Sequence, residues 1–220
     1  MKLIPDGTGR FPEHPHYEID ELEEECEQLI TSFLERRYGQ IVIPVPTDAL
    51  RVLIEGEAAK LLYADLSHEG EEVHGITEFF PGRRPLVTIA RELSVQPWRV
   101  HRERTTLTHE FGHVHWHAPL YDRYCRPHER HKCARGQLLP RRGQRDWMEW
   151  QAGYVSGALL MPRSRARLLA EAFRREHAME LPLPVGASDG QILVGRVSEL
   201  FDVSREAAEI RLQQLGHLLP

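Results

Sequence analysis

Two histidines four residues apart, His109 and His113, stand in the run Thr-His-Glu-Phe-Gly-His at residues 108–113. On a helix, side chains at this spacing lie on one face about 6 Å apart, so both imidazoles can converge on one metal ion. Zinc is the usual metal for neutral imidazole nitrogens. Glu110 follows the first ligand on the flank of the metal, where it can take a proton from a water molecule that the metal activates. The pattern predicts metal-assisted peptide hydrolysis.

A chance match is the plainer interpretation, because the motif is short and the chain has 13 histidines. The neighbouring residues argue against it. Leu107, Phe111, Val114 and Ala118 recur at helical spacing and predict a helix that is at least half buried. Buried imidazoles without a partner would cost free energy, and Gly112 leaves room for close packing beside a metal. We therefore favour a metal site.

A catalytic zinc ion needs three protein ligands and one open position, so a third ligand has to come from elsewhere in the chain. His117 continues the spacing but lies about 12 Å along the helix from His109, which is too far to share its metal. The metzincin pattern also fails, because Trp116 and Pro119 stand where it needs glycine and histidine. A carboxylate from a downstream helix is the remaining option.

Glu149 fits this option, because it opens a predicted helix whose small residues would allow tight packing against the first helix. These small residues are Ala152, Gly153, Ser156 and Gly157. Asp146 and Asp122 are weaker candidates, since both lie in or next to a predicted loop. A set of two histidines and one carboxylate accepts zinc, and it also accepts manganese.

Three stretches together resemble the ImmA/IrrE metallo-endopeptidases: residues 106–113 (Thr-Leu-Thr-His-Glu-Phe-Gly-His), 149–152 (Glu-Trp-Gln-Ala) and 159–162 (Leu-Leu-Met-Pro). The resemblance covers about residues 45–217 and combines separated motifs, which makes it specific. It implies a zincin-like domain in which His109, His113 and Glu149 bind zinc and Glu110 is the catalytic base.

The resemblance also implies a protein substrate. This substrate would be a specific regulatory protein, such as a helix-turn-helix repressor of a mobile element, a toxin–antitoxin system or a stress response. Thr105 stands where the family usually has phenylalanine, and Gly153, Ser156 and Gly157 replace its asparagine and alanine residues. These departures affect packing and not ligation.

The alternative is a non-enzymatic role, as a metal-stabilised protein- or DNA-binding regulator of a mobile element or toxin–antitoxin system. A structural metal would be closed by a fourth protein ligand. Cys125, Cys133 or His117 would then have to reach the metal.

Composition sets the broad class. The chain has 220 residues, 41% hydrophobic and 28% charged, as in a soluble globular protein with a sizeable core. Its net charge of −5 gives no overall electrostatic case for nucleic acid. The opening residues lack an apolar leader, and no apolar run is long enough to cross a bilayer. The odd set Cys26, Cys125 and Cys133 is too small for a disulfide scaffold, so we expect a reducing cytoplasm.

Hydrophobic periodicity predicts an α+β fold, with a small mixed sheet before the metal-site helix and helix-turn-helix-like helices at the C-terminus. We expect an N-terminal arm and helix at 1–46, a zincin-like metallopeptidase domain at 47–180 and a helical subdomain at 187–220. Strands are predicted at 60–66, 73–80 and 86–93. Helices are predicted at 17–38, 48–55, 97–117 (ended by Pro119), 147–161, 164–179 (capped by Ser164), 191–200 and 204–215.

Other segments carry weaker signals. Residues 7–16 suggest an irregular arm, and the acidic run 21–27 suggests a solvated helix face. Residues 120–145 lack helical periodicity and are basic, so we expect a long loop that acts as a flap over the cleft. In the tail, Arg196, Arg205 and Arg211 are offset by acidic neighbours, which favours packing or protein interaction over DNA binding. These acidic neighbours are Glu199, Asp202, Glu206 and Glu209.

Two further sets of side chains suggest chemistry. Cys125, His128, His131 and Cys133 could bind a second metal, although their spacing matches no common zinc pattern. An oxyanion on the scissile carbonyl would need a donor. The candidates are His115, His117, His177 and Tyr154.

Overall fold

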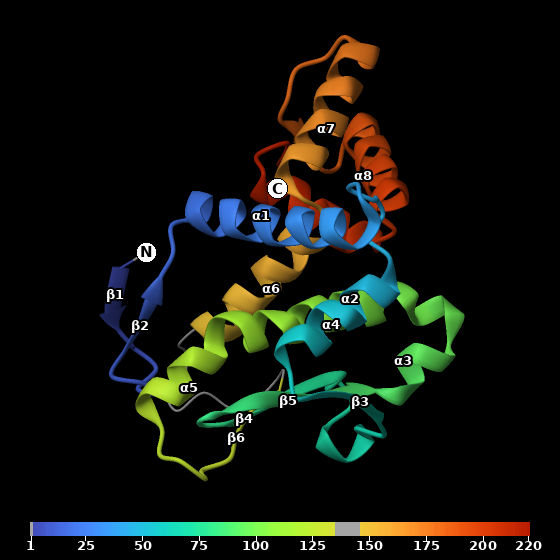
Figure 1. Ribbon diagram of the computed structural model, residues 1–220. Helices are drawn as coiled ribbons and strands as arrows, with labels where there is room; N and C mark the ends of the chain where they lie inside the picture. Colours follow the sequence, from blue (N-terminus) through green and yellow to red (C-terminus); the bar gives the residue numbers. More distant parts are fainter. Residues whose placement is uncertain (1, 135–145) are drawn as a thin grey trace. The chain divides into compact units, whose positions relative to one another are not determined.

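The computed structural model describes residues 2–134 and 146–220 (Figure 1). The chain divides into two compact units, each made of two separate segments. The first unit contains Met1–Leu22 and Thr47–Ser156, and the second contains Glu23–Pro46 and Gly157–Pro220. The three ranges expected from the sequence stay a prediction.

Helices and strands are mixed along the chain, often as two consecutive strands or helices. The strands are β1 (Lys2–Pro5), β2 (Glu13–His16), β3 (Lys60–Ala64), β4 (Gly75–Phe80), β5 (Arg83–Ala90), β6 (His131–Ala134), β7 (Leu183–Pro184) and β8 (Leu218–Leu219). The α-helices are α1 (Ile19–Tyr38), α2 (Thr47–Glu57), α3 (Arg91–Val95), α4 (Val100–Gly112), α5 (Ala118–Tyr124), α6 (Trp147–Leu160), α7 (Arg163–His177), α8 (Ser188–Phe201) and α9 (Arg205–Gln214). The turns η1 (Ser67–Glu69) and η2 (Pro97–Arg99) are 3₁₀, and η3 (His113–His117) is a π turn.

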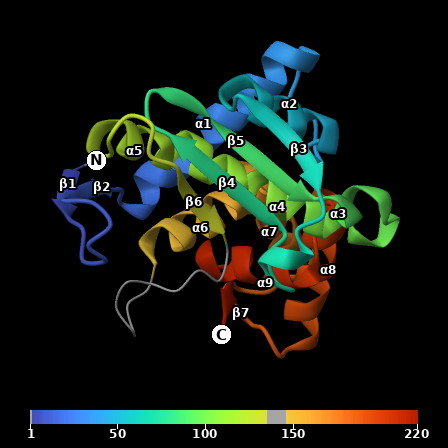
Figure 2. The same ribbon diagram turned by 90° about the horizontal axis from the view of Figure 1, so that it is seen from below.

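The first unit contains a four-stranded mixed sheet with the strand order β3-β5-β4-β6. β3 pairs with β5 in parallel, and the other pairs are antiparallel. Helices α2 and α4 lie on one face of this sheet (Figures 1 and 2), where Val87, Ile89, Leu107 and Phe111 are fully buried. The α+β class with a small mixed sheet is therefore confirmed, and the predicted strands correspond to β3, β4 and β5.

The motif helix extends further than the sequence predicts. Pro119 does not end it, because α4 continues through the π turn η3 into α5. In η3 the Ala118 N–H bonds the His113 carbonyl, a wider i→i+5 turn, and this places Pro119 in the first turn of α5. A proline there costs no hydrogen bond, since the first helical N–H groups have no intrahelical partner.

The expected long loop at residues 120–145 is wrong for its first part. Residues 120–124 belong to α5, and β6 pairs with β4, with His131 opposite Phe79. Tyr121 and Cys133 are buried in one cluster with Phe79, which anchors both elements. The apolar side chains are too few to show a period, but the backbone hydrogen bonds of the strand pair do not depend on side-chain pattern. Residues 135–145 lie outside the described part of the chain.

The N-terminal arm is more regular than expected. β1 and β2 form an antiparallel pair, with Lys2 opposite His16. In the turn between them, the Asp6 carboxylate accepts hydrogen bonds from the Thr8 and Phe11 N–H groups at 2.8 and 2.9 Å. A buried carboxylate and not a set of apolar side chains holds this turn, so a hydrophobic pattern could not predict it. Hydrogen bonds to the charged form of Asp6 lower the pKa of its carboxyl despite burial.

The acidic run 21–27 is exposed at Glu21, Glu24 and Glu25, as expected, but Glu23 of the second unit forms a buried ion pair. Glu23 is buried, and its carboxylate accepts two hydrogen bonds from Arg211 of α9, which is itself fully buried. Arg211 Nε also donates to the Met161 carbonyl at 3.1 Å. The expected cap by Ser164 is also wrong: Pro162 caps α7, and the Ser164 N–H bonds the Glu27 carboxylate instead.

The predicted C-terminal pair of helices corresponds to α8 and α9. α8 ends at Asp202, which adopts a left-handed backbone with φ 51°. Ser204 then caps α9, and its hydroxyl accepts the Ala207 N–H at 3.1 Å. In the part of the chain that the structure describes, no helix has both the length and the apolar character needed to cross a bilayer.

Close packing joins α4 and α6 in the first unit. A Cβ atom on Gly112 would lie 3.1 Å from Ala152 Cα, and the Thr108 and Ser156 hydroxyls are 2.7 Å apart. Ala152 and Ser156 thus provide the contact expected of the small residues of α6. Gly153 does not, because a Cβ there would meet no atom within 4 Å.

We expect Gly112→Val to destabilise the protein by about 1–3 kcal/mol, because the added atoms would push α6 away from α4. The matched control is Gly153→Ala, at an exposed helical glycine, which should stabilise the fold by about 0.5–1 kcal/mol. Urea unfolding of the two variants measures both effects. Equal stability of Gly112→Val and wild type would show that this approach is not tight.

Candidate metal centre

Three side chains from two helices of the first unit converge at one point. His109 and His113 of α4 and η3 direct their Nε2 atoms toward each other at 3.3 Å. The Glu149 carboxylate of α6 lies 3.2 Å from His109 Nε2 and 3.3 Å from His113 Nε2. The sequence predicts all three residues as metal ligands, and the structure brings them together.

These separations fit a tetrahedral cation. Ligands held at 2.0–2.1 Å from zinc in tetrahedral geometry are about 3.3–3.4 Å from one another. The two Nε2 atoms have this spacing, and each is also at this distance from one oxygen of Glu149, which is Oε2 for His109 and Oε1 for His113. Two ring nitrogens and a carboxylate oxygen are also the donor set of catalytic zinc sites, so the residues fit a divalent metal.

The start of α6 positions Glu149. Asp146 accepts the Met148 N–H at 3.0 Å, and its carboxylate forms a two-pronged ion pair with Arg10. Asp146 therefore acts as a helix cap and does not join the histidines. Asp122 accepts the Gly82 N–H at 2.7 Å, so the second weaker candidate is also engaged elsewhere.

Glu110 is buried against β4. Thr77 Oγ1 donates a hydrogen bond to Glu110 Oε2 at 2.7 Å. On the other side, a Cβ atom at Gly75 would lie only 2.4 Å from Glu110 Oε1, so only glycine fits there. Burial raises the pKa of Glu110, while His113, His109 and Thr77 partly oppose the rise. A carboxylate with a raised pKa is a stronger base than a solvated one.

A chain of hydrogen bonds orients the ring of His113. Gln151 Oε1 lies 3.0 Å from His117 Nε2, and an amide oxygen only accepts, so His117 Nε2 donates. The His117 Nδ1 lone pair then accepts from His113 Nδ1 at 2.9 Å. Burial, with the nearby His113, lowers the pKa of His117 well below its usual value, which keeps this ring neutral. His113 is left with Nε2 facing the other two ligands.

The pKa values of Glu149 and His113 are shifted in directions that favour the charged form of each group when no metal is bound. Burial opposes ionisation of Glu149, but hydrogen bonds from His109 and His113 outweigh it and lower the pKa of the carboxyl. Burial likewise disfavours a charged His113, and Glu149 outweighs it and raises the pKa of the ring. Metal binding would have to displace the proton that the charged form of His113 carries on Nε2.

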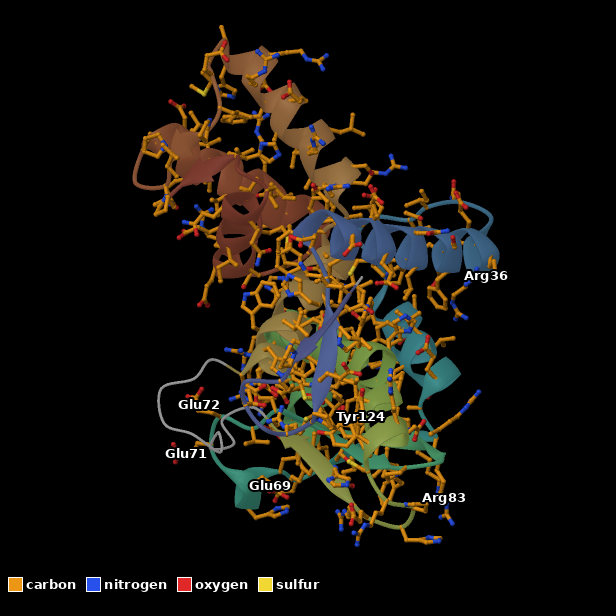
Figure 3. All side chains as sticks on the ribbon, turned by 90° about the vertical axis from the view of Figure 1, so that its left-hand side faces the viewer. Arg36, Glu69, Glu71, Glu72, Arg83 and Tyr124 are labelled. Atoms are coloured by element: carbon orange, nitrogen blue, oxygen red, sulfur yellow. The ribbon has the colours of Figure 1, made fainter. Side chains whose placement is uncertain are left out.

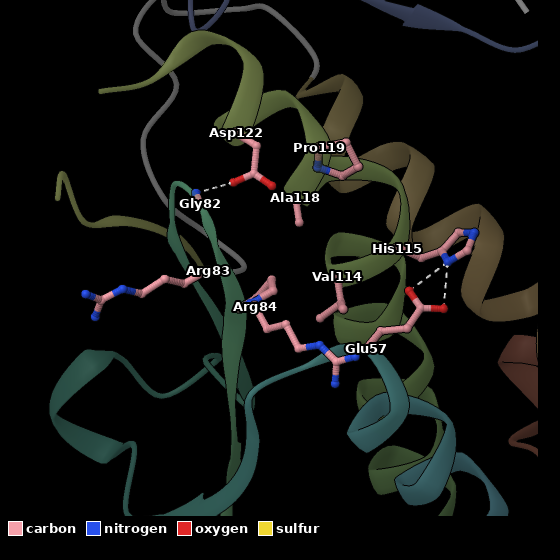
Figure 4. A pocket seen from close by; sticks show the side chains of 10 residues that line it. Glu57, Gly82, Arg83, Arg84, Val114, His115, Ala118, Pro119 and Asp122 are labelled. Carbon is pink, nitrogen blue, oxygen red and sulfur yellow. Dashed lines mark hydrogen bonds and ion pairs between the residues drawn. The ribbon is translucent and has the colours of Figure 1, made fainter. Parts of the chain in front are cut away.

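His115 and His117, which the sequence proposed as oxyanion donors, have other partners within the first unit. His115 contacts the Glu57 carboxylate at 2.8 and 3.0 Å in a hollow of about 380 Å³ that contains none of the predicted ligands (Figure 4). His117 uses both ring nitrogens, as described above. His177 belongs to the second unit and stacks on Phe173, and Tyr154 is buried beside Trp150.

Sequence reasoning missed Thr77, Gly75 and Gln151. Thr77 and Gly75 lie in a strand that is buried along almost its whole length, and Gln151 is one polar residue in an apolar helix. No spacing rule links any of them to the motif. Among the described residues, the group of ligand atoms around His109 contains neither Cys125 nor Cys133.

A comparison with protein families shows which family the chain belongs to. The family described as Peptidase_M78, IrrE N-terminal-like domain, matches residues 60–213. The chain belongs to this family. The match includes β3 to α9 and thus every residue of the centre, so the resemblance to the ImmA/IrrE peptidases is confirmed. The comparison with curated proteins returned no match.

Within this M78 domain we expect Gln151→Leu to weaken metal binding about 10–100-fold, because His117 would lose the acceptor that fixes its tautomer. Gln151→Glu keeps an acceptor and should retain affinity close to wild type. Competition with a chromophoric chelator measures both constants. Unchanged affinity in a folded Gln151→Leu protein would show that this chain of hydrogen bonds does not orient His113.

Proposed function

We propose that this M78-family protein is a zinc-dependent endopeptidase, with His109, His113 and Glu149 as the metal ligands and Glu110 as the general base. One observation carries the proposal. The two imidazoles and the Glu149 carboxylate converge, with one ligand atom of each within 4.8 Å of the others, beside a buried carboxylate to which Thr77 of β4 donates a hydrogen bond. A structural ion would not need that fourth, non-ligating acid.

A bound zinc ion would polarise the carbonyl of the scissile peptide and acidify a water molecule next to it. The chain's own contribution is proton transfer. Glu110 takes the proton of the attacking water and later delivers it to the leaving amine. Thr77 donates to one oxygen of Glu110, which leaves the other oxygen to accept and release the proton. Manganese fits the same donor set.

The proposed substrate is a specific regulatory protein in the cytoplasm, such as a helix-turn-helix repressor or an antitoxin. Membership of the M78 family supports a peptidase, and the resemblance to ImmA/IrrE proteins motivates this class of substrate. The tail arginines support a protein partner over DNA, because they are engaged within the second unit. Arg196 pairs with Glu176, Arg205 donates to the Gln191 carbonyl and Arg211 is buried with Glu23.

The non-enzymatic alternative requires a fourth protein ligand. Of the residues named for that role, His117 bonds His113 and Gln151, and Cys133 lies 3.6 Å from the Tyr121 hydroxyl. Cys125 belongs to a different group of side chains. We therefore favour the peptidase.

We expect Glu110→Gln to keep the metal and to lower cleavage by at least about 10²–10⁴-fold, since the amide cannot accept the proton. The chain, co-expressed with the regulator encoded beside it, should release a fragment of that regulator that the variant does not release. Metal content by mass spectrometry checks that the site is intact.

The matched control is His115→Asn, in the same helical segment but bonded to Glu57. This variant should keep both metal and cleavage. Full cleavage by Glu110→Gln would remove Glu110 as the base. A variant that loses metal as well as cleavage would instead give Glu110 a role in ligation.

A further inference from the structure

A second group of metal-ligating side chains lies in the turn between α5 and β6. Cys125, Glu129 and His131 each place one donor atom so that all three lie within 4.8 Å of one another. His131 Nε2 and Glu129 Oε2 are 3.4 Å apart, a separation that two ligands have on a tetrahedral cation. We propose that this cluster binds a second, thiophilic divalent cation of the zinc type.

The backbone holds the three residues in place without a metal. The Cys125 N–H bonds the Tyr121 carbonyl at 3.0 Å, where α5 ends. The Glu129 N–H bonds the Arg126 carbonyl at 3.2 Å in the following turn. His131 then opens β6. Since hydrogen bonds fix each backbone position, a cation would find much of its site already formed.

The ring of His131 faces the cluster. Its Nε2 atom is shielded from solvent and makes no hydrogen bond in the described residues, and Glu129 Oε2, at 3.4 Å, is a member of the cluster. The ring packs against Tyr121 with 5.1 Å between centroids, which limits its rotation. A buried ring nitrogen of this kind is unfavourable unless something binds it. A cation shared with Cys125 and Glu129 would satisfy it.

The neighbouring cations are directed away from the cluster. Arg130 pairs with Glu78 of β4, and Lys132 pairs with Glu69. Figure 3 labels Glu69 and also Tyr124, which directly precedes Cys125. Their charges are therefore balanced by other carboxylates. Neither Arg130 nor Lys132 occupies the Glu129 carboxylate, which accepts a hydrogen bond from the Arg126 N–H at 3.4 Å among the described residues.

This ligand set differs from the pattern that the sequence suggested. His128 is exposed, with φ 74°, and lies outside the cluster, while Cys133 is buried beside the Tyr121 hydroxyl. Glu129 takes part instead. A set of thiolate, imidazole and carboxylate suits zinc, cobalt or nickel, whereas magnesium and calcium prefer oxygen ligands alone.

Occupancy would stabilise the strand next to the catalytic helix. The cation would join the end of α5 to the start of β6, and β6 pairs with β4 so that Cys133 lies opposite Thr77. Thr77 in turn donates to Glu110. The second cation would therefore stabilise the pair of strands β4 and β6, and β4 in turn holds Glu110 through Thr77.

Titration of the metal-free full-length protein with Co²⁺ tests the proposal. A cobalt–thiolate bond gives a near-ultraviolet charge-transfer band, and the centre at His109, His113 and Glu149 contains no sulfur. We expect the wild type to bind a second equivalent of cobalt and to show this band. Cys125→Ser should lose both the band and the second equivalent.

Three controls make the result specific to this cluster. His128→Asn, at a neighbouring histidine outside the cluster, should keep the band, and His131→Ala should lose it. Glu149→Gln should also keep it, which separates this site from the proposed peptidase centre. Absence of the band in the wild type, or its survival in Cys125→Ser, would overturn the proposal.

Discussion

The close approach of α4 and α6 is the constraint on which the metal centre depends. Two ligands lie on the α4 segment and the third on α6, so their meeting requires the two helix backbones to come near each other. Gly112 and Ala152 permit this, since any Cβ on Gly112 would press on the Ala152 backbone. The hydroxyl contact between Thr108 and Ser156 adds a polar link one turn away. A cation at the centre would tighten the same approach, because it binds both helices.

Burial gives the surrounding polar groups their role. Glu110, His113 and His117 are each almost fully buried, and in this environment every hydrogen bond left unmade is costly. Each group has a partner: Thr77 for Glu110, and Gln151 through His117 for His113. These partners restrict each ring and carboxylate to one orientation. The site is thus ordered before a metal or substrate arrives, which reduces the cost of binding.

In the second unit, buried charged side chains depend on a partner in the same way. Arg211 and Glu23 are buried together, and removing either partner would leave an uncompensated charge. Such a pair fixes how α9 packs on α1 within the unit. Because Arg211 is buried in this pair, its charge is not at the surface of the helix-turn-helix-like tail, where DNA binding would need it. This burial is consistent with our proposal that the partner is a protein and not DNA.

The spacing within residues 108–113 was enough to predict how the side chains of the motif lie relative to one another. His109, Glu110 and His113 are neighbours on one helix, and helical geometry alone places their side chains together; the family and the α+β class followed from such patterns. Only the tertiary structure decided which distant residues complete the centre. Thr77 lies 33 residues from Glu110 and Gln151 lies 34 residues from His117, and contacts at that range depend on how a strand and two helices pack. The same holds for the second cluster, where spacing suggested His128 and Cys133, but the path of the turn between α5 and β6 brought Glu129 beside Cys125 and His131.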